Sequence, residues 1–181
     1  NFYLTNKTRV RDRLTDSYIS FKILSTVEKS GRKRAMKILK HHRQSIECLA
    51  INDPSVLYTI KLIRLLTNLT TLNLTGVYDQ VSHPHDKIKI DLPNLKNLTV
   101  VDSSKFLRHI GEHIIEECYL NDSSNLLLIN KFLETCPRLK KLTLEDTLPT
   151  YDRKVHTYKL EFLDVRNKTN PSSFRIKKFL E

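Results

Sequence analysis

The sequence predicts an α/β solenoid in which short parallel strands line a concave face, while helices and irregular loops form the convex face. Two observations carry this prediction. One eight-residue pattern recurs six times along the 181 residues, and most segments between the copies have helical periodicity. A strand this short cannot bury its apolar side alone. Stacked copies must therefore cover one another, which gives a curved, horseshoe-shaped array.

Each copy of the repeating unit has apolar residues at its first, fourth and sixth places. The six copies begin at Ile46, Leu69, Leu95, Ile115, Leu139 and Leu160. Their starts lie 23, 26, 20, 24 and 21 residues apart, in or near the range of roughly 20–29 residues that is typical of leucine-rich repeats. Places four and six, such as Leu72 and Leu74, point to one face of a strand. Five units end in Asp or Asn, which can bond backbone where the strand turns away, and Gly76 ends the other.

The segments around these units are assigned in chain order. Upstream, residues 17–24 alternate like a strand, and residues 30–44 form a helix with Ala35, Ile38 and Leu39 inward. Further helices are predicted at 54–68, beginning at Pro54, at 122–137, capped by serines, and at the start of 170–181. Residues 103–113 indicate a shorter helix or 3₁₀ turn. Residues 75–93 and 147–158 are predicted as irregular loops, the first with a short strand at 87–91.

The whole chain is expected to form one domain and to be a fragment of a longer array. Residues 1–45 are predicted as a basic, degenerate N-terminal repeat, and residues 46–181 hold the six clear repeats, with the array expected to continue beyond 181. Three cysteines argue against a disulfide scaffold and favour a reducing, intracellular compartment. Three glycines leave no glycine-rich phosphate loop, and no run of about 18 apolar residues is present.

One repeat carries a more specific signature. A helix ending in Cys-Pro and followed by Leu-x-x-Leu-x-Leu resembles the leucine-rich repeats of F-box proteins. The matching residues are Leu133, Cys136, Pro137, Leu139, Leu142 and Leu144. The segments "SFKIL" and "SIECLAI" resemble the region after an F-box, and the resemblance covers roughly residues 17–170. It implies the substrate-recognition part of an SCF-type ubiquitin-ligase subunit, which has no catalytic residues of its own and reaches the SCF adaptor and cullin through an F-box upstream of Asn1.

The strand positions that face away from the core are the predicted binding site. The third, fifth and seventh places of five units are Thr71, Asn73, Thr75, Asn97, Thr99, Val101, Glu117, Tyr119, Asn121, Lys141, Thr143, Glu145, Phe162, Asp164 and Arg166. The middle of this set is small and polar. Its far end is charged and includes two aromatic residues, which are common interface anchors. A protein substrate is the expected partner, and a solvated sheet face is the alternative.

No pattern in the sequence predicts catalysis, a cofactor or a metal. Paired carboxylates, a nucleophile with a matched base, and a phosphate loop are not found. His109 and His113 are four residues apart, yet the third ligand that a metal site requires is missing, so both are expected to be surface residues. Cys118 falls at a core place, and Cys136 is expected to cap a helix end.

Two features support alternative functions. Residues 1–43 contribute +9 of the +11 net charge, and the basic patch is Arg32, Lys33, Arg34, Lys37, Lys40 and Arg43. A basic scaffold that binds RNA or acidic membrane is one alternative, although amphipathic spacing favours a solvated or docking helix face. Six Asn-x-Ser/Thr sequons begin at Asn6, Asn68, Asn73, Asn97, Asn121 and Asn167. They would be glycan acceptors if the chain were an extracellular leucine-rich-repeat receptor.

Overall fold

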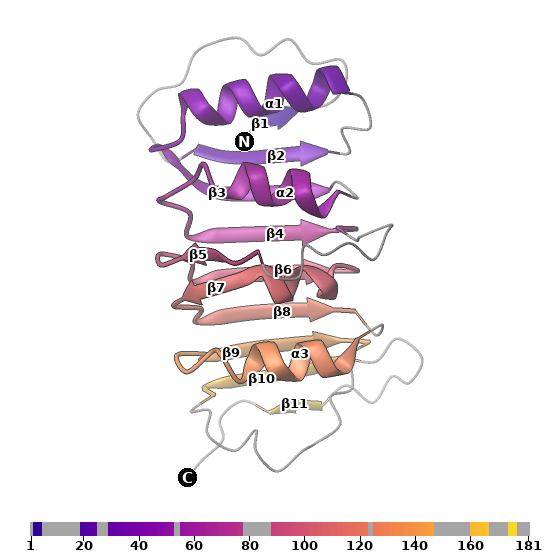
Figure 1. Cartoon of the computed structure of the whole chain (residues 1–181). Helices are drawn as coiled ribbons and strands as arrows, with labels where there is room; N and C mark the ends of the chain where they lie inside the picture. The colour runs from indigo at the N-terminus through magenta and orange to yellow at the C-terminus, as the bar shows by residue number, and fades with distance from the viewer. Residues whose placement is uncertain are drawn as a thin grey trace.

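The computed structural model describes residues 2–4, 19–24, 29–52, 55–77, 88–122, 125–146, 160–166 and 174–176, with side chains from Arg32 onward except those of Leu126 and 174–176. The described residues form the predicted α/β fold with a large parallel sheet (Figure 1). Each strand pairs with the next strand of the main sheet along the chain, in parallel except for the last pair. The main-sheet strands are β1 Phe2–Leu4, β2 Ile19–Leu24, β3 Ile46–Asn52, β4 Thr71–Thr75, β6 Asn97–Val101, β8 Glu117–Asn121, β9 Lys141–Glu145, β10 Phe162–Arg166 and β11 Phe174–Ile176.

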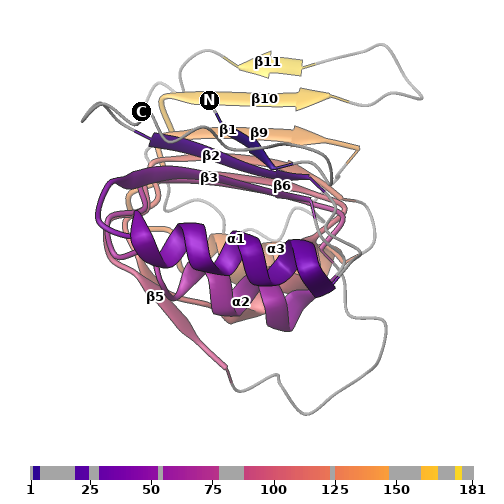
Figure 2. The same ribbon diagram turned by 90° about the horizontal axis from the view of Figure 1, so that it is seen from above.

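The described helices all lie on one side of this sheet (Figure 2). They are α1 Lys29–His41, α2 Val56–Ile63 and α3 Leu126–Leu133, with the 3₁₀ helix η2 Ser104–His109. A two-stranded parallel sheet, β5 Ile90–Leu92 with β7 Ile110–His113, occupies the same layer between α2 and α3 (Figure 1). The core lies between this layer and the main sheet, and the opposite sheet face is covered by none of the described helices.

The apolar places of the repeating unit pack against one another across the sheet. Strands β4, β6, β8, β9 and β10 pair place for place, so Leu72 lies beside Leu49 on one side and Leu98 on the other. The first and fourth places of all six units are buried, and so are the sixth places of five. Val165 is the sixth-place residue that is only partly buried. The predicted core positions are therefore confirmed.

Three strand ends show why Gly or Asp suits the eighth place of the repeating unit. Gly76, Asp102 and Asp146 have φ values of 61°, 48° and 52°, in the left-handed region that Gly adopts freely and Asp tolerates better than most residues. In this conformation each backbone N–H reaches the seventh residue of the next strand. The N–H groups of Gly76, Asp102 and Asp146 donate to the carbonyl oxygens of Val101, Asn121 and Arg166 at 3.0, 2.9 and 2.9 Å.

The helix caps differ from those the sequence predicted. Helix α2 begins at Val56, where the Ser55 hydroxyl accepts a bond from the backbone N–H of Tyr58 at 3.3 Å. Helix α3 is capped by Asn125, whose Oδ1 accepts from the N–H of Leu128 at 3.2 Å. Pro54 and the two predicted capping serines lie outside the described residues. Both helices are shorter than predicted. After each helix, a short non-helical segment connects its C-terminal end to the next strand of the sheet.

One predicted element was confirmed only in part, and another was wrong. Residues 104–109 form the 3₁₀ helix η2 within the predicted segment. Residues 103–113 do not form one helical segment, because the helix ends at His109 and residues 110–113 form β7. Gly111 permits this pairing, since a Cβ there would meet the Asp91 carboxylate at 2.2 Å. The helix predicted within residues 170–181 is absent at 174–176, which form β11 antiparallel to β10. The free backbone edge of β10 offers this short segment hydrogen-bond partners that an isolated helical turn lacks.

Candidate functional site

The predicted binding residues lie together on the sheet face that the described helices leave uncovered. This surface is called the open wall, and it comprises the third, fifth and seventh places of the strands from β4 to β10. Side chains alternate across a strand, so burying places four and six against the helices turns these positions the other way. Parallel pairing without offset then aligns them in rows, as for Thr71, Asn97, Glu117, Lys141 and Phe162.

The first half of the open wall, on β4 and β6, is polar. The Asn97 side chain donates from Nδ2 to Thr71 Oγ1 of the neighbouring strand at 3.3 Å. Asn73 and Thr99 are half-buried, and Thr75 is exposed. A hollow of about 240 Å³ opens over the wall between β4 and β9 and so spans parts of both halves. The side chains around it include Thr71, Asn73, Asn97, Thr99, Glu117, Tyr119, Lys141 and Thr143.

The second half of the open wall is a network of charged and aromatic side chains. Glu117 and Lys141 are directly opposite in neighbouring strands, and their Oε2 and Nζ atoms are 3.1 Å apart. The same ammonium lies 5.9 Å from the ring centroid of Phe162. The Tyr119 hydroxyl donates to the carboxylate of Glu145 on the neighbouring strand β9, two residues beyond Thr143, which pairs with Tyr119. These contacts link the charged and aromatic side chains of three neighbouring strands, β8, β9 and β10.

Two of the predicted contact residues, Thr143 and Asp164, are not exposed as expected. They are buried, with 9% and 2% of their surface exposed. Thr143 is a small residue paired between Tyr119 and Asp164. Arg166 folds over Asp164 and donates to its Oδ2 from Nε at 3.0 Å and from Nη2 at 2.8 Å. This hydrogen bond to the carboxylate raises the pKa of Arg166. The guanidinium, not the carboxylate, is therefore the group that a partner meets.

Sequence reasoning missed one strand of the wall. The unit that starts at Ile46 also has third, fifth and seventh places, which are Cys48, Ala50 and Asn52. They pair with Thr71, Asn73 and Thr75 of β4 and extend the open wall by one strand. The apolar spacing that located the outward-facing residues of the other five strands would also have found these three residues.

Five of the six residues of the basic patch belong to α1, on the helix side of the molecule (Figure 2), and Arg43 follows the end of this helix. Five of its residues are exposed: Lys33, Arg34, Lys37, Lys40 and Arg43. Arg32 is partly buried, with its guanidinium 5.0 Å from the ring centroid of Tyr58 on α2. The carbonyl of the same arginine accepts from the Tyr58 hydroxyl at 3.0 Å. Arg32 therefore connects α1 to α2, and the other basic side chains of the patch face solvent.

The two histidines are not the surface pair that the sequence predicted. His109 is fully buried in η2, where its Nδ1 lies 3.0 Å from the Ile88 carbonyl oxygen. His113 belongs to β7 and is half-buried, with Nε2 3.2 Å from Thr135 Oγ1, and burial lowers its pKa. The two rings therefore contact different segments of the chain. Among the described residues, no group of three or more His, Cys, Asp or Glu side chains is placed to hold a metal ion.

All three cysteines are free thiols. Cys118 is buried at its predicted core place, and burial raises its pKa well above the ordinary value. Cys136 lies two residues beyond Glu134, the C-cap of α3, and its backbone N–H donates to the Leu133 carbonyl oxygen at the predicted helix end at 2.9 Å. Its Sγ lies 3.4 Å from the Phe132 carbonyl oxygen inside the core, and burial raises its pKa to about 12. Both thiols are protonated at neutral pH, so neither is a nucleophile.

The chain matches no known family model, no curated protein and no solved structure. Within the part of the chain that the structure describes, no helix is long and apolar enough to cross a membrane.

Proposed function

We propose that the chain is a leucine-rich-repeat solenoid that binds a protein partner through its open wall. We further propose that it is the substrate-recognition part of an F-box-type subunit of an SCF ubiquitin ligase. The observation that carries the proposal is the in-register row structure of the wall. Repeated strands expose one continuous polar surface, while the helices and the apolar places occupy the other side.

The dimensions of the open wall favour a protein over a small molecule. Six strands from β3 to β10, spaced about 4.8 Å apart, span about 24 Å, and a five-residue strand is about 17 Å long. The resulting footprint suits a small, transient protein interface. The hollow of about 240 Å³ is smaller than the roughly 300–1,000 Å³ that small-molecule sites usually offer. Transient binding is what a substrate receptor requires.

The composition of the second half of the wall supports the same conclusion. Tyr119, Phe162 and Arg166 belong to the residue types that dominate protein-interface energetics. Lys141 lies between them and is held by Glu117. A partner would therefore meet two pre-positioned aromatic rings beside cationic groups. Such pre-positioning lowers the entropy cost of association.

The F-box assignment rests on the resemblance of the repeat around Cys136 and Pro137. Support against the extracellular alternative comes from Asn97, one of the sequon residues. Its Nδ2, the atom that would carry a glycan, donates to Thr71 Oγ1 within the wall. A glycan at Asn97 or at its neighbour Asn73 would cover the surface proposed for the partner.

The experiment is an affinity purification of the protein from its own cells with the proteasome blocked. The wild type is compared with Thr99→Arg, which fills the hollow of the wall, and with Thr67→Arg, the same change at an exposed residue outside the wall. We expect the SCF adaptor and a cullin with all three proteins. A set of other proteins should be lost only with Thr99→Arg.

Each part of the proposal can fail separately. Purification without adaptor and cullin refutes the F-box assignment, and glycans on the sequons would replace it with the receptor alternative. Recovery of the same partners with Thr99→Arg as with Thr67→Arg shows that the open wall is not the binding surface. Thermal unfolding of both variants confirms that they are folded.

A further inference from the structure

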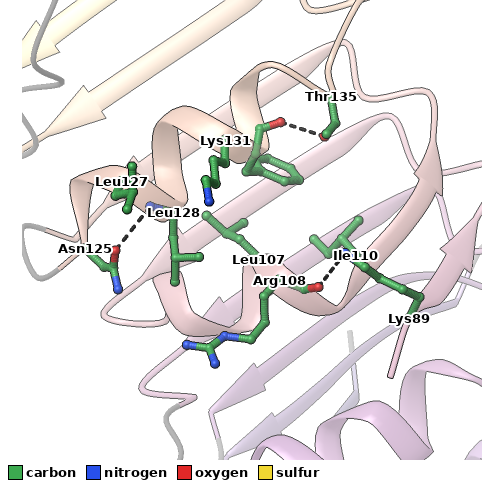
Figure 3. A pocket seen from close by; sticks show the side chains of 10 residues that line it. Lys89, Leu107, Arg108, Ile110, Asn125, Leu127, Leu128, Lys131 and Thr135 are labelled. Carbon is green, nitrogen blue, oxygen red and sulfur yellow. Dashed lines mark hydrogen bonds between the residues drawn. The ribbon is translucent and has the colours of Figure 1, made fainter. Parts of the chain in front are cut away.

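We propose that a groove between η2 and α3, on the helix side of the molecule, binds an acidic peptide segment of a protein partner through an apolar anchor residue. This site is separate from the open wall, and it does not depend on the F-box assignment. The groove has a volume of about 550 Å³, within the range of roughly 300–1,000 Å³ that is typical of ligand-binding sites. Figure 3 shows the ten residues that line it.

The floor of the groove is apolar and firmly held. Leu107 and Ile110 belong to the end of η2 and the start of β7, and Phe132 belongs to α3; all three are at most 5% exposed. Leu107 from η2 and Leu128 from α3 project into the gap between the two helices (Figure 3). Because the floor residues also pack into the core, the groove is a fixed feature that can receive a leucine or an aromatic ring.

The rim of the groove is cationic. Lys89, Arg108 and Lys131 line it, and none of the ten lining residues is acidic. The Lys89 ammonium donates to the Arg108 carbonyl oxygen at 2.7 Å, which holds this cation at the edge of the groove. The Lys131 side chain extends from α3 over the opposite edge (Figure 3). Charge complementarity therefore selects an occupant with carboxylates on both sides of its apolar anchor.

Leu127 identifies the occupant as a peptide segment instead of a small anion. Its side chain is large and apolar, yet 66% of its surface is exposed, which sets it apart from the other large hydrophobic residues that the structure describes. It lies at the end of the groove beside Asn125, the N-cap of α3 (Figure 3). A small ligand confined to the groove would leave this leucine in water. A peptide that continues past the groove covers it and gains apolar contact.

The test uses a phage library of random twelve-residue peptides panned against the immobilised 181-residue chain. We expect enriched peptides with two or more Asp or Glu flanking a Leu, Phe or Trp. The best synthetic peptide should bind roughly tenfold more weakly to Lys131→Glu and to Leu127→Asp. Its binding should also weaken between 0.05 and 0.5 M NaCl, as the Debye length falls from about 14 to 4 Å.

Two control variants locate the binding. Lys61→Glu makes the same charge reversal at an exposed position of α2, and Thr99→Arg alters only the open wall; neither should change the peptide affinity. The proposal is overturned if panning enriches no peptide over the Lys131→Glu chain, or if Thr99→Arg abolishes binding. It is also overturned if phosphatidylserine vesicles bind in a Lys131-dependent way while no acidic peptide does. Both groove substitutions are at exposed residues, and circular dichroism verifies the fold.

Discussion

The alternation of buried and exposed positions along β4 makes a quantitative prediction for two adjacent residues. Leu72 is fully buried and lies between Leu49 and Leu98 of the neighbouring strands. Asn73, the next residue, is half-buried and lies on the open wall. Replacing each with alanine removes a side chain of similar size from opposite faces of one strand. The two variants therefore compare the loss of a buried apolar side chain with the loss of a partly exposed polar one at adjacent positions.

The expected loss of stability follows from the packing. Leu72→Ala removes apolar surface worth about 2 kcal/mol in transfer free energy. The two flanking leucines belong to a continuous apolar layer and cannot collapse fully into the gap, so a cavity term raises the total to about 3–4 kcal/mol. Asn73→Ala creates no cavity, and its effect should stay within about 0.5–1 kcal/mol. The free energy of unfolding of such a domain is about 5–15 kcal/mol.

Urea unfolding followed by circular dichroism measures both variants. With a slope of about 2 kcal/mol/M, Leu72→Ala should lower the midpoint by about 1.5–2 M and Asn73→Ala by less than about 0.5 M. The opposite order would mean that β4 is shifted by one residue, because a single-residue shift exchanges the two faces of a strand. Equal shifts would refute the two-sided arrangement of the sheet.

Three further predictions concern single buried or constrained groups. Thr59 is fully buried in α2, and its hydroxyl has no hydrogen-bond partner among the described residues. Thr59→Val should therefore raise the free energy of unfolding by about 1 kcal/mol and the Tm by about 2–4 °C in calorimetry; a lower Tm would show that the hydroxyl is bonded. Gly76→Ala should cost about 1 kcal/mol in the urea assay and Gly76→Asn less, because the φ of 61° strains alanine more; equal costs contradict this. Iodoacetamide at pH 8 should modify Cys48 in the folded chain and should reach Cys118 and Cys136 only after denaturation, since burial raises the pKa of both; mass spectrometry reports the sites.

Most of the sheet could be predicted from the sequence because its signal is local and repeated. An apolar residue at places one, four and six requires a one-sided strand, and six copies at similar spacing require that the strands stack. The helix at residues 30–44 was found in the same way, since Ala35 and Leu39 lie one turn apart and both are buried. These features depend on residues close together in the sequence, so a single chain is enough to show them.

The elements that the sequence did not predict are set by contacts between distant segments. Strand β7 exists because β5 lies beside it and because Gly111 leaves room for the Asp91 carboxylate, which also accepts the Glu112 N–H at 3.0 Å. Strand β11 exists because β10 offers a free edge. The groove between η2 and α3 likewise brings together Lys89 and Lys131, which are 42 positions apart. No local pattern contains that information.

In the candidate site, too, the sequence predicts some properties of a side chain and not others. Alternation predicts which way a side chain points, but its exposure depends on the size and charge of its neighbours. Thr143 points to the open wall and is still buried, because it is a small residue among larger ones. Asp164 points the same way and is covered by Arg166. A partner on this wall would consequently contact the long side chains of the second half, Tyr119, Lys141 and Phe162 among them. Substitutions at Thr143 should alter binding far less than substitutions at these three residues.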